Sequence, residues 1–285
     1  MEQFSEIRRQ SALADLQSAN WLRHVEWQAE VDSTNNLAKQ WFIANPNDVP
    51  ALFVADQQTA GRGRSGNQWW SPSGCLMMSL VIPSTELTAD LALHPQLALL
   101  VGVAVARAVD TLLGNPSPGN ESVAQGALSA QLKWPNDVYI HSKKIAGILI
   151  ETVQSRSSIH GASIGFAIGV GINAQINWQD APVQLLERAI CLSTAAKRPI
   201  YCEEVLLEVI ENLQSQFSNW QADARSWFHD WQERCLLTDR IVHVRSAESG
   251  EVTGLCQGID SQGRLLLRTE NQTYSLNACE ILSWS

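Results

Sequence analysis

A run of glycines interleaved with arginines, Gly61-Arg62-Gly63-Arg64-Ser65-Gly66, constrains the fold of this chain most. Apolar segments flank the run, Leu52–Ala55 before it and Leu76–Ile82 after it, and both have the length and composition of buried strands. Glycines let the backbone of such a loop approach a ligand closely, and the two guanidiniums add fixed positive charge and forked donors. The sequence therefore predicts a loop between two strands that grips a phosphate or a carboxylate.

The whole-chain composition is that of an ordinary globular protein. The chain has 285 residues, 45% hydrophobic and 17% charged, enough for one large domain and a small one. A formal charge of −9 argues against broad binding to nucleic acids or membranes, because both depend on excess positive charge. The first residues lack a signal-peptide pattern, and Arg107 and Asp110 interrupt the apolar segment 97–113. We therefore expect a buried helix there, no membrane span and a cytoplasmic protein.

The spacings of cysteine and histidine do not indicate a metal site. The six cysteines are dispersed, without the close pairs of a zinc site, so we expect reduced and mostly structural thiols. His94, His141 and His229 show no paired spacing either, and we expect them at the surface.

Hydrophobic periodicity predicts strands and helices in mixed order. Residues 25–32 alternate as a half-buried strand, and Ser33 or Thr34 can cap a helix that runs through Phe42. Residues 114–126 contain prolines and glycines and are expected to form a looped insertion. Further strands are expected at 128–134, 138–140, 145–151, 159–172, 241–244, 252–259, 265–268 and 273–276, and further helices at 95–113, 182–195 and 202–231.

Four further blocks accompany the Gly-Arg run. They are Asp32–Asn35, Lys133-Trp134-Pro135-Asn136-Asp137, Lys144-Ile145-Ala146-Gly147-Ile148-Leu149 and Gly169–Ala174. In this order the five blocks resemble the biotin-protein ligases, which activate biotin as an adenylate and transfer it to a lysine of a carrier protein. The segment before Glu30 is too short for the winged helix-turn-helix with which some members repress transcription. The resemblance therefore implies a monofunctional ligase without an N-terminal DNA-binding domain.

The resemblance also implies an α+β fold. We expect a mixed, largely antiparallel sheet with flanking helices, as in the class II synthetase-like catalytic domain of the family, at 1–236. A small SH3-like β-barrel is expected at 237–285. The closing strand of the family often carries an arginine where this chain has Trp284. The implied partners are biotin, ATP with Mg²⁺, and the biotin carboxyl carrier protein of acetyl-CoA carboxylase, and the sequence allows a homodimer through an exposed sheet edge.

Activation of biotin by ATP brings a carboxylate against the α-phosphate, and the two anions repel each other. At a separation of ~4 Å each pair of unit charges costs ~4 kcal/mol at an effective dielectric constant near 20. Arg62, Arg64 and Lys144, with Mg²⁺ on the nucleotide, can offset this cost and stabilise charge on the phosphoryl oxygens. We expect the loop to order around the ligand, and its closure to shield the labile adenylate from water.

The resemblance assigns roles residue by residue. It assigns catalysis to Arg64, Lys144 and Lys133; biotin binding to Ser33, Thr34, Asn35, Gln58, Arg62, Gly63, Arg64, Lys144 and Gly147; nucleotide binding to Arg62, Trp69, Asn136 and Asn173; and Mg²⁺ to Asp137. In the family, the strands that carry Gly147, Gly165, Gly169 and Gly171 form the floor of the pocket, and Trp178 would cover the adenine.

Each motif also has a purely structural interpretation. The Gly-Arg run alone could be a solvated basic loop, and Ser33 and Thr34 could simply cap a helix. Trp69 and Trp134 could belong to the core, and residues 136–137 could be an ordinary turn. The functional alternatives are a lipoate ligase or related acyltransferase on a similar scaffold, and a non-catalytic binding module, which would need the pocket but not its catalytic cations.

Overall fold

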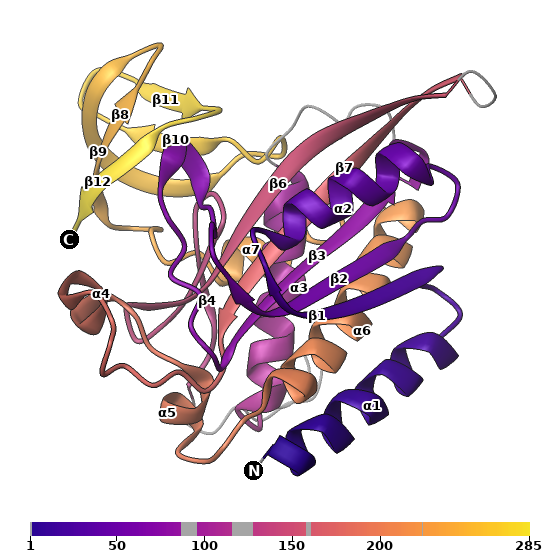
Figure 1. The fold of residues 1–285 in the computed structure, drawn as a ribbon. Coiled ribbons are helices and arrows are strands. Elements are labelled where there is room, and N and C mark those ends of the chain that lie inside the picture. Colours follow the sequence, from indigo (N-terminus) through magenta and orange to yellow (C-terminus); the bar gives the residue numbers. More distant parts are fainter. Residues whose placement is uncertain (1, 87–95, 116–127, 158–160, 224) are drawn as a thin grey trace.

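The computed structural model describes residues 2–86, 96–115, 128–157, 161–223 and 225–285, which form a large mixed sheet flanked by helices and a small C-terminal barrel (Figure 1). The helices are α1 (Glu2–Ser18), α2 (Thr34–Ala44), α3 (Gln96–Leu112), α4 (Val183–Arg188), α5 (Leu192–Ala196), α6 (Cys202–Ala222) and α7 (Phe228–Glu233). The large sheet contains β1 (His24–Val31), β2 (Ala51–Gln58), β3 (Cys75–Pro83), β4 (Gln131–Lys133), β5 (Asp137–Ile140), β6 (Lys143–Ser157) and β7 (Gly161–Asn173). The barrel contains β8 (Ile241–Ser246), β9 (Gly250–Ile259), β10 (Leu265–Arg268), β11 (Thr273–Leu276) and β12 (Glu280–Trp284).

The large sheet has the strand order β1-β2-β3-β7-β6-β5-β4, with β1 and β2 parallel and all other neighbours antiparallel. Helices α3 and α6 cover one face, with α1 beside α6, and α2 lies on the other face across β2, β3, β6 and β7 (Figure 1). The expected burial of the apolar helix is confirmed, because nearly every residue of α3 is buried. No helix within the described ranges is long and apolar enough to cross a bilayer.

The two faces of β7 differ in composition, and this difference places the site. Phe166, Ile168, Val170 and Ile172 join the large apolar cluster on the side of α3 and α6. Glycines occupy positions 165, 169 and 171 on the opposite face, where neighbouring side chains approach too closely for a Cβ atom. Successive residues of a strand point to opposite faces, so one strand supplies both a core wall and an open floor.

The barrel has the strand order β11-β10-β9-β8-β12, and the segment that leads into it pairs with β4 of the large sheet. The backbone of Leu132 pairs with residues 234–236 through bonds of 2.7 and 2.8 Å, so the segment that leads to the barrel runs along β4. Trp134 is buried, and its Nε1 donates to the Gly263 carbonyl at 2.9 Å. The core interpretation of Trp134 is therefore confirmed.

Most expected elements are present, but three expectations differ from the structure. The helix expected over 202–231 ends at Ala222, where Asp223 adopts an extended backbone, and a second helix begins at Phe228. The helix expected over 182–195 is two short helices, because residues 189–190 are held extended by the bond from the Ile190 N–H to the Lys144 carbonyl. The strand expected over 128–134 is shorter, at Gln131–Lys133. Residues 116–126 of the expected insertion lie outside the described residues.

All six cysteines are unpaired, as expected. His141 and His229 are exposed, also as expected, whereas His94 lies outside the described residues. Helix α1 was not predicted.

Candidate functional site

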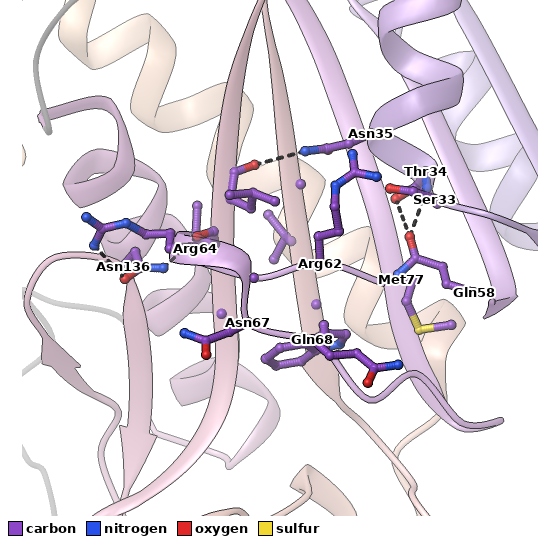
Figure 2. A pocket seen from close by; sticks show the side chains of 18 of the residues that line it. Ser33, Thr34, Asn35, Gln58, Arg62, Arg64, Asn67, Gln68, Met77 and Asn136 are labelled. Atoms are coloured by element: carbon purple, nitrogen blue, oxygen red, sulfur yellow. Dashed lines mark hydrogen bonds between the residues drawn. The ribbon is translucent and has the colours of Figure 1, made fainter. Parts of the chain in front are cut away.

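A cavity of about 170 Å³ lies between the α2 side of the large sheet and the loop formed by residues 61–69. Every residue expected around biotin lines this cavity, and so do Trp69, Asn136 and Asp137 (Figure 2). Residues from all five sequence blocks therefore line a single cavity, together with side chains from β2 and β3. Their contacts with a ligand stay predictions.

Glycines form the floor of the cavity. A Cβ atom at Gly171 would lie 2.6 Å from Cε2 and Nε1 of Trp69, and one at Gly147 would lie 2.9 Å from Cζ3 of the same ring. A Cβ atom at Gly169 would lie 2.6 Å from Asn35 Oδ1. These glycines let Trp69 and Asn35 sit directly on the sheet. Gly165 differs from the expectation for the floor, because it faces the Phe42 ring under α2 and not the cavity.

The polar end of the cavity lies at the start of α2. The N–H and the hydroxyl of Thr34 lie 2.8 and 3.2 Å from Gln58 Oε1, to which both donate (Figure 2). Ser33 occupies the N-cap position of α2, one of the two alternatives expected, but its side chain makes no capping bond. Gln58, at the end of β2, accepts from the first N–H of the helix instead. Ser79 Oγ lies 2.7 Å from Thr34 Oγ1 and 2.6 Å from Asn35 Oδ1.

Sequence reasoning missed Ser79. It is fully buried on β3 and connects two residues of the cavity. Its one signal in the sequence is a lone hydroxyl within the apolar run 76–82.

The Gly-Arg loop lies over the cavity and is attached to the sheet by its two arginines. The Arg62 guanidinium extends toward Asn35 in Figure 2, and its Nη2 donates to Asn36 Oδ1 at 2.8 Å and to Glu151 Oε2 at 3.2 Å. Arg64 Nη1 donates to Asn136 Oδ1 at 3.2 Å, in the turn between β4 and β5. Ser65 and Gly66 have φ values of 55° and 77°, so the reversal that follows Arg64 uses the left-handed region that glycine favours.

The cationic end of the cavity combines Arg64 with Lys144 and Asp137. Lys144 Nζ lies 2.6 Å from Asp137 Oδ1 and 5.4 Å from the centre of the Trp69 ring. Burial lowers the pKa of Arg64, and Asp137 offsets part of this effect. The two cations can therefore face an anion in a site where screening by water is reduced.

A second cavity, of about 260 Å³, adjoins the first and shares Trp69, Asp137 and Lys144 with it. Trp70 and Trp178 line it with ring centres 5.9 Å apart. Its shape and aromatic walls suit a flat heterocycle.

Two further residues were expected in the site. Asn173, expected near the nucleotide, lines the second cavity and not the first, and its Nδ2 donates to the Ile190 carbonyl at 3.0 Å, which anchors the chain before α5. Lys133 lines neither cavity; its Nζ lies 4.3 Å from the centre of the Trp284 ring and 5.8 Å from that of Tyr139. Burial lowers the pKa of Lys133, with the charge of Asp137 opposing the change. Trp284 therefore occupies a place beside a cation.

The single acidic side chain of the cavity suits a metal ion that binds together with substrate phosphates. Asp137 is the one carboxylate that lines the first cavity. Within the described ranges, no three His, Cys, Asp or Glu side chains form a group that could hold a metal ion. Mg²⁺ commonly binds through one or two carboxylates together with substrate phosphates, and a single aspartate fits that pattern.

Two family models match the chain. Residues 27–173 match "Biotin/lipoate A/B protein ligase family", and residues 238–282 match "Biotin protein ligase C terminal domain". The first match contains four of the five sequence blocks and all but the last residue of the fifth, and the second covers β8 to β11 and the start of β12.

Similar curated proteins include the bifunctional ligase/repressor BirA of Bacillus spizizenii, which is 30% identical over 91% of this chain and 74% of its own length. The biotin--[acetyl-CoA-carboxylase] ligase of Mycobacterium tuberculosis is 26% identical over 91% of this chain and 89% of its own length. Among solved structures, the biotin protein ligase of Aquifex aeolicus in complex with biotin and ATP has a TM-score of 0.72 and 27% identity, covering 92% of this chain and 98% of that one. The Leishmania major enzyme in complex with biotinyl-5-AMP has a TM-score of 0.59 and 27% identity, covering 91% and 98%.

Proposed function

This chain belongs to the biotin/lipoate A/B protein ligase family, and we propose that it is a biotin–protein ligase. It activates biotin with ATP to biotinyl-5'-adenylate and transfers the biotinyl group to a lysine of a carrier protein. The similar ligases solved with biotin and ATP, and with biotinyl-5-AMP, support this proposal.

The arrangement of Arg64 and Lys144 at one cavity carries the proposal. Biotin enters with its ring system toward Thr34, Asn35 and Gln58, whose donors and acceptors suit a urea-like head. Its carboxylate then lies near Lys144, which exchanges its contact with Asp137 for the substrate. The second cavity receives the adenosine.

The reaction proceeds in two displacements. The biotin carboxylate attacks the α-phosphorus of ATP, and pyrophosphate leaves. Arg64 and Lys144 bind the developing negative charge and need not transfer a proton. The carrier lysine then attacks the carbonyl of the mixed anhydride, and AMP leaves. Asp137 would hold a Mg²⁺ ion that accompanies ATP, and this ion would neutralise charge on the phosphates.

We propose the biotin carboxyl carrier protein of acetyl-CoA carboxylase as the acceptor and the cytoplasm as the location. The unpaired state of all six cysteines supports a reducing compartment. The net charge of −9 favours partners other than nucleic acid. For a homodimer we propose pairing through β1, because β4, at the other side of the sheet, already pairs with residues 234–236. We place the boundary between the catalytic domain and the barrel at residues 236–237.

One experiment tests the proposal against its alternatives. The protein is incubated with ATP, a carrier domain and either biotin or lipoate, and the carrier is weighed by mass spectrometry. A biotinyl increment on one lysine is the expected result. A lipoyl increment would identify a lipoate ligase, and an unmodified carrier together with measurable biotin binding would identify a non-catalytic module.

A further inference from the structure

Glu151, on β6, is a carboxylate beside the cavity. The proposed reaction gives it no role. Its Oε1 accepts a hydrogen bond from Lys39 Nζ at 2.8 Å. Its Oε2 accepts one from Asn35 Nδ2 at 2.8 Å and one from Arg62 Nη2 at 3.2 Å. One carboxylate therefore joins α2, the pocket residue Asn35 and the Gly-Arg loop.

The contact with Arg62 is a long-range attachment of the loop. Arg62 and Glu151 are 89 residues apart in the chain, and their side chains are 38% and 27% exposed. Burial alone would raise the pKa of Glu151, but hydrogen bonds from Lys39 and Asn35 and the charges of Lys39 and Arg62 lower it overall. The group is therefore an anion at neutral pH and holds a cation of the loop against the sheet.

The same carboxylate fixes the orientation of Asn35. Asn35 Nδ2 donates to Glu151 and, at 3.3 Å, to the Leu149 carbonyl, while its Oδ1 lies 2.6 Å from Ser79 Oγ. With both of its donor hydrogens committed to the strand, the amide presents a defined face to the cavity.

Glu151 is also well separated from the cationic end of the cavity. Six residues of β6 lie between it and Lys144, so seven Cα-to-Cα steps, or about 23 Å of extended strand, separate the two. Arg62 therefore attaches the loop at one place, to Glu151 and Asn36, and Arg64 attaches it at a second place, to Asn136. The negative charge at the first place does not oppose the binding of anions at the second.

We propose that Glu151 is a positioning residue that holds the Gly-Arg loop closed over the cavity through Arg62 and keeps Asn35 oriented toward the ligand. The role in catalysis rests on the proposed biotin ligase function, because closure matters there by retaining the adenylate. The attachment of the loop itself does not depend on that function.

The test replaces Glu151 by glutamine, which keeps the shape and removes the charge. Limited trypsin digestion reports loop opening, since cleavage after Arg64 requires the loop to leave the sheet. The substitution itself does not alter either partner of the contact between Arg64 and Asn136. We expect Glu151→Gln to speed this cleavage by about three- to tenfold, the range for losing one partly exposed charged hydrogen bond. The escape of biotinyl-adenylate should speed up by a similar factor, and the single-turnover rate of adenylate formation at saturating biotin should stay within about twofold.

Lys39→Met is the matched control. It removes an ion pair from the same carboxylate but leaves the loop contact in place, so cleavage after Arg64 should stay within about twofold of the unmodified protein. Equal acceleration in both variants would overturn the proposal, because it would indicate a general loosening of the sheet. Unchanged cleavage in Glu151→Gln would overturn it as well.

Arg62→Met breaks the same contact from the loop side and carries the test should Glu151→Gln fail to fold. Trypsin should cleave the double variant, with both Glu151→Gln and Arg62→Met, no faster than the faster single variant, because the two changes remove the same ion pair. Additive acceleration would contradict the proposal. The digestion needs no ligase activity. Failure of the proposed function, in which the unmodified protein forms no adenylate, is therefore distinguishable from failure of the attachment.

Discussion

Replacing Gly171 with alanine tests whether the glycine face of β7 makes room for Trp69. The new Cβ atom would lie 2.6 Å from two ring atoms of Trp69, whereas ordinary contact begins at 3.4 Å, so the indole must retreat by about 0.8 Å (3.4 minus 2.6). The backbone cannot follow easily, because the Trp69 N–H is bonded to the Gly61 carbonyl at 3.0 Å. The ring must therefore swing into one of the two cavities that it lines.

The magnitude follows from the cost of overpacking. Insertion of a methyl group into a close-packed site costs ~1–3 kcal/mol, and for a domain of this size each kcal/mol lowers the midpoint of thermal unfolding by roughly 2–4 °C. If the displaced ring occupies the volume of the ligand, the same energy weakens binding by about fivefold to 150-fold. We therefore expect Gly171→Ala to lose both stability and affinity for biotin.

Gly165→Ala separates these two effects. Its Cβ atom would lie 2.6 and 2.7 Å from the Phe42 ring, on the same face of the same strand but outside both cavities. Calorimetric titration with biotin and thermal unfolding of both variants should show similar losses of stability, with weaker binding only for Gly171→Ala. Equal losses of affinity in the two variants, or full affinity in Gly171→Ala, would refute the reasoning.

Three further predictions concern charge and packing. Lys144→Met should slow adenylate formation about a thousandfold in single-turnover assays, since one cation ~4 Å from an anion contributes ~4 kcal/mol at an effective dielectric constant near 20; a loss below tenfold would contradict the role of Lys144. Gly102→Ala, within α3, should raise the free energy of unfolding in urea by ~0.5–1 kcal/mol, because its Cβ would lie 3.4 Å from Leu132 and 3.8 Å from Ile148, in ordinary contact; a decrease would show that the helix cannot accept the methyl group. The lowered pKa of Glu151 means that its contribution is complete above the ordinary glutamate value of 4.5 and is lost only as pH falls through the lower folded value. The protection factors of the amides of residues 61–66, which are corrected for the intrinsic pH dependence of exchange, should therefore fall only in acid, and Glu151→Gln should remove that dependence; a fall near neutral pH would contradict it.

Much of the site could be predicted from the sequence because its residues lie in short, ordered blocks. The Gly-Arg loop, the turn with Asn136 and Asp137, and the strand with Lys144 each have a local pattern that indicates backbone conformation and charge at once. The apolar flanks of each block identify the strands that bring them together. The glycines at 147, 169 and 171 were expected at the floor for the same reason.

The remainder depends on contacts that no local pattern encodes. Glu151 joins the site through Arg62, a partner 89 residues away, and the pairing of two charged side chains leaves no periodic signal. The break between α6 and α7 was missed because apolar residues continue through it: Trp220 and Trp227 stack with ring centres 6.3 Å apart although they lie on either side of it. Gly165 was misplaced because a glycine that faces Phe42 and one that faces a cavity look alike in the sequence.

The pairing of residues 234–236 with β4 has a consequence for dissecting this protein. A fragment that ended at Glu233 would lack the residues that pair with β4 at the edge of the sheet. The N–H and C=O of Leu132 would then be free to pair with another molecule. A fragment that continued to Leu237 would retain this cover, although Trp134 would still lose the carbonyl of Gly263. The last residues before the barrel thus protect the catalytic sheet from self-association, and where the chain is cut matters more than whether the barrel is removed.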